Sequence, residues 1–334
     1  MTNFSCPSTS FPSSNYLDSP EFLKLALHTV TATSTPIYLL GVYSILFKTP
    51  KPMESVKWYI FTLHFWILLY DYSVGVLIVP FLLMPHCAGT TLGVLASFGV
   101  STLIQAMFGI LVLYSMFISI TSIFENRFFI ICQFRGKQYW RVYRKLWLFL
   151  MYSAHFCLIF PVVFLIPDQE KARLEVFQNL PCLPTSIYQS DVLVIASDST
   201  YQVSIALVML FFFCLQNGFF ITQLILNGRE QQKSQTTSLK TYQMHQQLFR
   251  ALVLQMTIPL LMLVFPLSFG YSTLYFDYYN QAAIHACVIS IVSHGALSTV
   301  VMIVVHKPYR LAVTGMMKGK DSRVSKISLP PTVL

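Results

Sequence analysis

The sequence predicts an all-α membrane protein, a seven-transmembrane helix bundle with its N-terminus outside the cell and its C-terminus in the cytoplasm. Three observations predict this fold. The 334 residues contain seven long apolar stretches; 55% of all residues are hydrophobic and 10% are charged; and Lys and Arg gather in alternate connecting segments. Because charged residues make up about 25% of ordinary soluble domains, this composition indicates a membrane domain.

Each apolar stretch is long enough to cross a bilayer, since about 20 apolar residues in a helix span the roughly 30 Å hydrocarbon layer. The predicted helices are residues 25–47, 58–84, 93–124, 146–166, 201–226, 251–276 and 283–305. Residues 1–24 then form an extracellular segment, residues 25–305 the transmembrane domain, and residues 306–334 a cytoplasmic tail. An odd number of crossings puts the two ends of the chain on opposite sides of the membrane.

The distribution of positive charge predicts which side is which. Of the 22 Lys and Arg residues, all except Lys24, Lys171 and Arg173 lie in segments that share one side. Positive charge near helix ends stays in the cytoplasm, so this bias favours an external N-terminus. The opposite orientation would break the rule at every loop, and we reject it.

Composition and motifs also exclude several classes of protein. Taken alone, the net charge of +9 would suggest a nucleic-acid partner. The basic residues instead line one side of the membrane, so we expect no nucleic acid to bind. The sequence contains no HExxH, Walker loop or G-x-S-x-G, and no Cys/His spacing typical of zinc. We therefore expect no enzyme activity, no metal and no cofactor. The predicted helix 283–305 has no Lys that could anchor retinal.

Asp71 is the one acidic residue deep inside a predicted helix. A charge at the bilayer centre costs on the order of 2.5–3.5 kcal/mol, so Asp71 needs a partner or water. Depth in the membrane pairs it with His294, near the middle of residues 283–305, or with the nearby Ser290, Ser293 or Ser298. We hypothesise a buried polar switch that couples these two helices. The alternative is a protonated Asp71 that serves only as a polar contact between helices.

A second group of polar and aromatic residues predicts a ligand cavity in the outer half of the bundle. Ser97, Ser101 and Gln105 recur at a spacing of four and so share one face of a helix. Residues at comparable depth on three other predicted helices complete the candidate site: Tyr201, Ser204, Phe265, Phe269 and His285. Apolar walls with a few polar groups are typical of small-ligand sites. Each residue has the alternative role of helix packing.

Three features belong to the predicted outer surface. The connection 167–200 is long, and long loops often have a function; it either covers a pocket or is a disordered connection. Cys87 and Cys182 face the oxidising side, so we predict a disulfide between them that would tether this loop. Asn3 stands in an Asn-Phe-Ser sequence, which is a glycosylation acceptor pattern.

Several sequence runs resemble a known family. They are Pro36-Ile37-Tyr38 with Ile45–Trp58, then Phe124-Glu125-Asn126-Arg127, Gln255–Leu261, and His306-Lys307-Pro308-Tyr309-Arg310. Together they resemble the nematode serpentine receptors of class H, which are chemosensory G-protein-coupled receptors. The resemblance covers all seven predicted helices. The chain departs from rhodopsin-like receptors in having no Asp-Arg-Tyr and no Asn-Pro-x-x-Tyr.

The resemblance implies a plasma-membrane chemoreceptor of sensory neurons that binds a small environmental chemical and couples to a heterotrimeric G protein. The basic residues expected to face the G protein are Arg127, Arg141, Arg144, Lys240 and Arg250. The alternative for these charges is that they only fix the topology. Two other functions stay open: a ligand-gated channel or transporter, and a membrane scaffold without ligand. The ending Thr332-Val333-Leu334 favours the scaffold, because it fits a PDZ-binding terminus.

Overall fold

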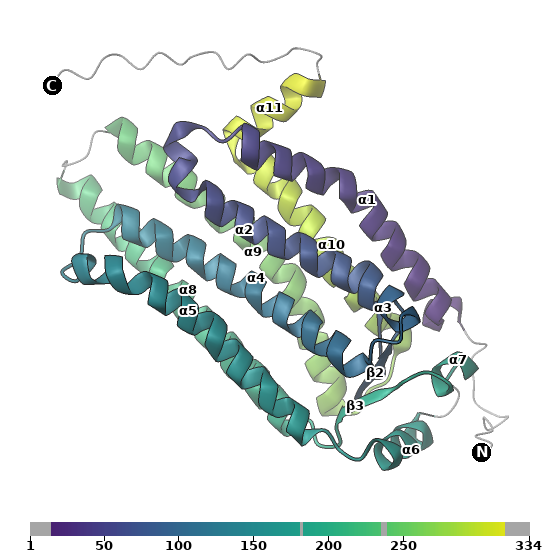
Figure 1. Ribbon diagram of the computed structural model, residues 1–334. Helices are drawn as coiled ribbons and strands as arrows, with labels where there is room; N and C mark the ends of the chain where they lie inside the picture. The colour runs from purple at the N-terminus through teal and green to yellow at the C-terminus, as the bar shows by residue number, and fades with distance from the viewer. Residues whose placement is uncertain (1–14, 181–182, 235–238, 318–334) are drawn as a thin grey trace.

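A computed structural model describes residues 15–180, 183–234 and 239–317. Seven long helices run roughly side by side through the molecule (Figure 1). They are α1 (Pro20–Phe47), α2 (Glu54–Tyr72), α4 (Thr102–Ile131), α5 (Lys137–Ile159), α8 (Thr200–Ser234), α9 (Leu239–Phe276) and α10 (Gln281–Val305). The predicted seven-helix bundle is confirmed. By length and composition, six helices of the described residues can cross a membrane; α9, 38 residues long, is the remaining long helix.

Local capping residues set several helix starts outside the apolar stretches. α1 begins at Pro20, because the Ser19 hydroxyl accepts a 3.1 Å hydrogen bond from the amide of Phe22. Pro is favoured in the first turn, where its missing N–H costs nothing. α10 begins in the same way behind Asn280, whose side chain accepts a 3.0 Å hydrogen bond from the amide of Ala283. α1 and α10 therefore begin before the apolar runs that predicted them.

The predicted helix 58–84 is wrong at its C-terminal end. The chain leaves the α-helix after Tyr72, makes a π-helical segment, η3 (Ser73–Ile78), and then reverses at Val79, which has a φ of 46°. Pro80 follows, and proline disfavours helical geometry at the residue before it and lacks an N–H. The predicted helix 93–124 is likewise wrong at its start. The long helix α4 begins at Thr102, after the separate one-turn helix α3 (Val94–Ser97).

A small antiparallel sheet, absent from the all-α prediction, lies at one end of the bundle. Its order is β1 (Pro80–Leu82), β2 (Cys87–Thr91), β3 (Leu193–Ala196), and Phe81 is paired with Thr90. The connection 167–200 contributes β3 and two helices, α6 (Gln169–Asn179) and α7 (Thr185–Tyr188). The interpretation of this connection as a disordered segment is wrong for its described part. It forms a folded cap.

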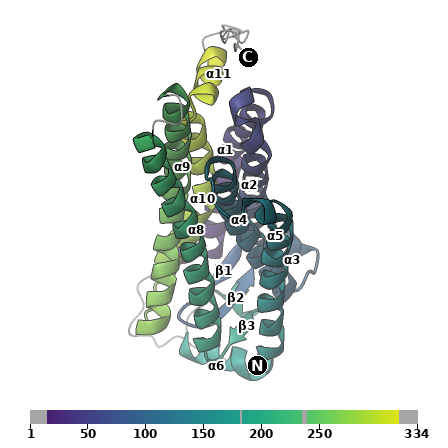
Figure 2. The ribbon, with the colours of Figure 1, turned by 90° about the vertical axis from the view of Figure 1, so that its left-hand side faces the viewer.

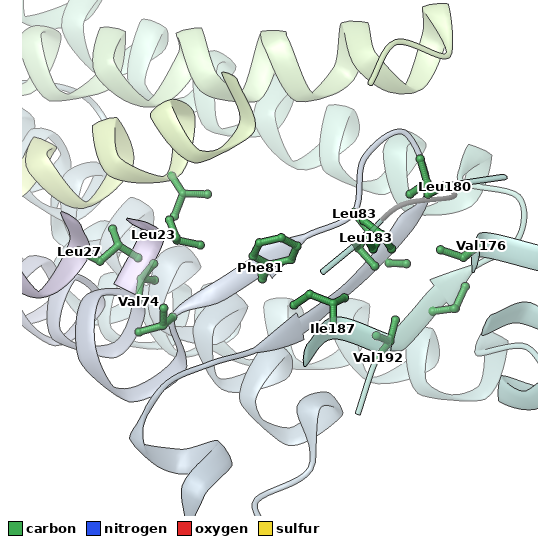
Figure 3. Packing of buried hydrophobic residues seen from close by; sticks show 14 of the residues in the cluster. Leu23, Leu27, Val74, Phe81, Leu83, Val176, Leu180, Leu183, Ile187 and Val192 are labelled. Carbon is green, nitrogen blue, oxygen red and sulfur yellow. The ribbon is translucent and has the colours of Figure 1, made fainter. Parts of the chain in front are cut away.

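The cap has a hydrophobic core of its own, which joins it to the bundle (Figure 3). Phe81 and Leu83 meet Ile187 and Val192 of the cap, and all four are 0% exposed. Leu23 and Leu27 of α1 belong to the same cluster. Full burial of one such side chain contributes about 1.5–3 kcal/mol. The cap is therefore held on the ends of the helices by apolar packing.

The opposite end of the bundle carries α11 (Lys307–Met317), as Figure 2 shows. Tyr309 anchors this helix: its ring is fully buried and its hydroxyl lies 2.9 Å from the hydroxyl of Thr49. At the same end, α4 continues to Ile131 and α5 begins at Lys137. The predicted inner loop 125–145 is thus largely helical.

Candidate functional site

The structure contains a cavity of about 740 Å³ among α4, α5, α8, α9 and α10. Its wall is mostly apolar, with Leu113 and Phe117 from α4, Phe213 from α8 and Ile291 from α10. Leu82 and Met84 close the side nearest the sheet. Among the described residues that line it there is no Asp, Glu, Lys or Arg. A cavity of this size and character is typical of a site for a small, uncharged molecule.

Three of the polar side chains that line this cavity come from three different helices. His155 of α5 bonds through Nδ1 to the carbonyl oxygen of Met151, and the Gln216 amide nitrogen of α8 lies 3.7 Å from the Met151 sulfur. The ring of Tyr114 on α4 lies 5.1 Å from the imidazole, centroid to centroid. These three residues are not among the predicted site residues. A usable signal was present, because His and Gln inside an apolar stretch are costly in a bilayer.

Of the eight residues predicted to bind ligand, Phe269 lines this cavity. The expectation that Ser97, Ser101 and Gln105 share a helical face is wrong, because Ser97 ends α3 and Ser101 precedes α4. Both serines are exposed. Gln105 is buried, and its amide nitrogen donates a 2.7 Å hydrogen bond to the carbonyl oxygen of Val100. This amide therefore shapes the turn before α4.

The other four predicted residues also lie outside the cavity lining. Tyr201, Ser204 and Phe265 are exposed, Phe265 to 69%. His285 is fully buried near the sheet, where Nδ1 lies 2.8 Å from the carbonyl oxygen of Leu17 and Nε2 lies 2.9 Å from the Gln281 amide nitrogen. For Tyr201, Ser204 and Phe265, the prediction did not find which side of the helix faces the cavity. Their ligand-binding role stays a prediction.

The predicted partners Asp71 and His294 lie together in the middle of the bundle. Their side chains are 1% exposed, and Nδ1 of His294 lies 3.5 Å from Oδ1 of Asp71. The Tyr38 hydroxyl of α1 donates a hydrogen bond to the other carboxylate oxygen. Nε2 of His294 lies 3.4 Å from the sulfur of Met116 on α4. One carboxyl group thus links α1, α2 and α10, and the imidazole extends this contact to α4.

Gly295 makes the close approach of α2 and α10 possible. A Cβ atom at this position would lie 2.6 Å from Cγ2 of Ile67 and 2.8 Å from the Tyr38 hydroxyl, and would also overlap the Asp71 carboxylate. These contacts are closer than van der Waals packing allows. The small residue beside His294 is therefore part of the same polar centre.

A second polar centre ties α4 to α5 near the α11 end. Glu125 receives two hydrogen bonds, 2.6 Å from Nη2 of Arg144 and 2.7 Å from the indole of Trp140. Arg144 also donates to Asn126 Oδ1 over 3.0 Å and to the Tyr59 hydroxyl over 3.2 Å. Arg144, predicted to face a G protein, thus holds two helices together in this conformation.

The remaining predicted contacts to a G protein differ in exposure. Arg127 is 4% exposed, and its Nε has no hydrogen-bond partner within the described part of the chain. Its charge adds to burial in lowering the pKa of His306, at the start of α11, to about 4. Arg141 is exposed. Lys240 and Arg250 belong to α9, and their side chains lie outside the described ones.

The cysteine and modification predictions fall partly outside the described residues. Cys87 in β2 forms no disulfide with any described cysteine. Burial raises the pKa of its thiol, against the opposing effect of a hydrogen bond with Ser199. Cys182, Asn3 and the C-terminal residues 332–334 are not among the described residues, so the disulfide, the glycosylation and the PDZ contact stay untested. Within residues 15–180, 183–234 and 239–317, no cluster of three or more His, Cys, Asp or Glu could hold a metal.

Seven long helices around an apolar cavity, with a buried polar centre between them, define a multi-pass membrane receptor of the seven-helix class. A family profile described as "Serpentine type 7TM GPCR chemoreceptor Srh" matches residues 18–319. The chain therefore belongs to the Srh family of serpentine chemoreceptors. It is similar to serpentine receptor class H-72 of Caenorhabditis elegans, with 24% identity over 324 residues, which cover 95% of this chain and 91% of that relative.

Proposed function

We propose that this chemoreceptor binds a small, mainly apolar environmental chemical in the cavity between α4, α5, α8, α9 and α10, and signals through a heterotrimeric G protein. The cavity carries the proposal, because it is apolar, about 740 Å³ in volume and lined by five of the seven long helices. A molecule that fills the cavity contacts all five of these helices. In the orientation that the positive charges favour, the inner ends of these helices face the cytoplasm. Expression in the plasma membrane of sensory neurons belongs to the same proposal.

The polar centre at Asp71 supports a mechanism for signal transfer. Ile291 lines the cavity and lies one helical turn from His294 on α10, and His294 faces Asp71. A ligand that binds one arrangement of α10 more tightly than another shifts the population of that arrangement. The Asp71–His294 contact is placed to transmit this shift to α2, and through Tyr38 to α1.

The test is a second-messenger assay in cells that express the receptor and a G protein, screened with volatile and water-soluble odorants. Ala206→Phe fills the cavity, because Ala206 lines it. We expect an active odorant to lose at least about tenfold in potency at equal surface expression, since filling the cavity excludes the ligand. Val208→Phe is the control, because Val208 is 50% exposed and does not line the cavity. Unchanged potency in Ala206→Phe would refute this site.

The same cells distinguish a G-protein-coupled receptor from the alternative of a ligand-gated channel. A channel conducts when its ligand binds, whether or not a G protein is present. We expect the odorant response to disappear in cells that lack the G protein. A ligand-evoked current that persists in those cells would favour a channel instead.

A further inference from the structure

We infer that the ligand carries a hydrogen-bond donor, such as an alcohol or phenol hydroxyl, on an uncharged apolar body, and that His155 or Gln216 accepts this hydrogen bond. The inference rests on the proposed function, since it describes the ligand of the same cavity. It comes from the hydrogen-bonding state of two side chains on different helices, α5 and α8.

The contact between His155 and Met151 fixes the chemistry of the imidazole. Nδ1 of His155 faces the backbone carbonyl oxygen of Met151, and a carbonyl oxygen can only accept. Nδ1 therefore carries the proton. In the neutral ring the other nitrogen, Nε2, then offers a lone pair and no hydrogen. The side chain that lines the cavity is thus an acceptor.

Gln216 supplies a second acceptor beside the first. Its amide nitrogen points to the Met151 sulfur over 3.7 Å, while Oε1 is buried and has no hydrogen-bond partner among the described residues. A buried acceptor that is left without a donor costs free energy, and a ligand that donates to it removes that cost. Both side chains contact Met151, and all three residues line the cavity.

The surroundings restrict the rest of the ligand. Tyr114 packs its ring 5.1 Å from the imidazole, centroid to centroid, which limits the orientations of His155. No Asp, Glu, Lys or Arg among the described residues lines the cavity, so a charged ligand would be buried without a counter-ion. A neutral molecule with one hydroxyl group donates a hydrogen bond and brings no charge into the cavity.

The inference is tested with the full-length receptor in lipid nanodiscs and matched pairs of probes. One member of each pair donates a hydrogen bond and the other is its methyl ether: 4-propylphenol with 4-propylanisole, and 1-decanol with decyl methyl ether. Apparent Kd values come from the shift in the thermal unfolding midpoint. Each donor is compared with its ether at equal probe concentration in the membrane. We expect at least one donor to bind about tenfold more tightly than its ether.

Two variants identify the acceptors. His155→Phe keeps an aromatic ring beside Tyr114, and Gln216→Met keeps the volume of the side chain, while each removes an acceptor. In the double variant we expect each donor and its ether to bind within about twofold of one another. A preference for the donor that survives in the double variant would overturn the inference, and so would pairs that the unmodified receptor does not distinguish.

Ala206→Phe separates failure of this inference from failure of the proposed function. If probes stabilise the unmodified receptor but donor and ether are equal, and Ala206→Phe abolishes both effects, the cavity stands and the donor requirement falls. If stabilisation by the donor is unchanged in Ala206→Phe, the probe binds elsewhere, and the cavity is not the site.

Discussion

Glu125 of α4 is paired with Arg144 of α5, 2.6 Å apart, and not with Arg127, its neighbour two positions along the same helix. Residues two apart on a helix face different directions. The Glu125 side chain is 3% exposed, so its charge depends on this partner and on the Trp140 indole. The pair therefore joins two helices at the α11 end and leaves Arg127 separate from it.

Loss of the Arg144 side chain is expected to destabilise the receptor. Removal of one partner from a buried ion pair leaves the other charge uncompensated and costs about 3–5 kcal/mol. Because the Arg144 side chain is 16% exposed, we expect the low end, about 3 kcal/mol, for Arg144→Met. Chemical unfolding in detergent measures it. The matched control is Arg141→Met on the exposed face of α5, which we expect to change stability by less than about 0.5 kcal/mol. Equal effects would contradict a structural role for Arg144.

Asp71→Asn tests whether the polar centre acts as a switch. Asn can still accept the hydrogen bond from Tyr38 but brings no negative charge to His294. If charge couples α2 to α10, the balance between the two receptor conformations changes, by about fivefold at the lower limit of measured coupling. Basal and odorant-evoked second messenger, normalised to surface expression, report this change. If both outputs matched those of the unmodified receptor, a charged switch would be ruled out.

Gly295→Ala is expected to disrupt the same centre by steric overlap. The added methyl group would push against Ile67, Tyr38 and Asp71, and crowding of a packed core costs about 1–3 kcal/mol. Gly218→Ala on α8 is the control, because a Cβ placed there meets no described atom within 4 Å apart from its chain neighbours and the nearby backbone of its own helix. Thermal unfolding midpoints should fall for Gly295→Ala and stay equal or rise slightly for Gly218→Ala. A stable Gly295→Ala receptor would mean that α2 and α10 pack less closely than described.

His306 predicts a pH dependence of stability. Burial, with the charge of Arg127 as the lesser cause, lowers its pKa to about 4, from about 6.5 in an unfolded chain. Between these values the unfolded chain binds more protons than the native one, so stability falls as the pH drops from about 6.5 to about 4. At pH 5 the loss is about 2 kcal/mol.

Stability measured at pH 7 and pH 5 checks this prediction. His306→Gln should reduce the difference between the two values, since it removes the titrating group. His28→Gln changes an exposed histidine on α1 and should leave the difference as it is. An unaltered difference in His306→Gln would show that another group is responsible.

The sequence by itself determined the number of long helices and their approximate places in the chain. Apolar length sets both, because the bilayer imposes one thickness on every crossing. The same reasoning placed His294 opposite Asp71, and their side chains do meet. Depth alone left Ser290, Ser293 and Ser298 as other candidates, and the structure places His294 beside Asp71.

Only the tertiary structure decided which side of each helix faces the cavity. Phe265 and Phe269 are four residues apart on α9, yet Phe265 is 69% exposed and Phe269 lines the cavity. An apolar side chain packs equally well against lipid and against another helix. Hydrophobicity therefore says little about the rotation of a helix about its own axis. The sequence did not predict the sheet, because β2 and β3 are more than 100 residues apart and pair only once the bundle brings them together.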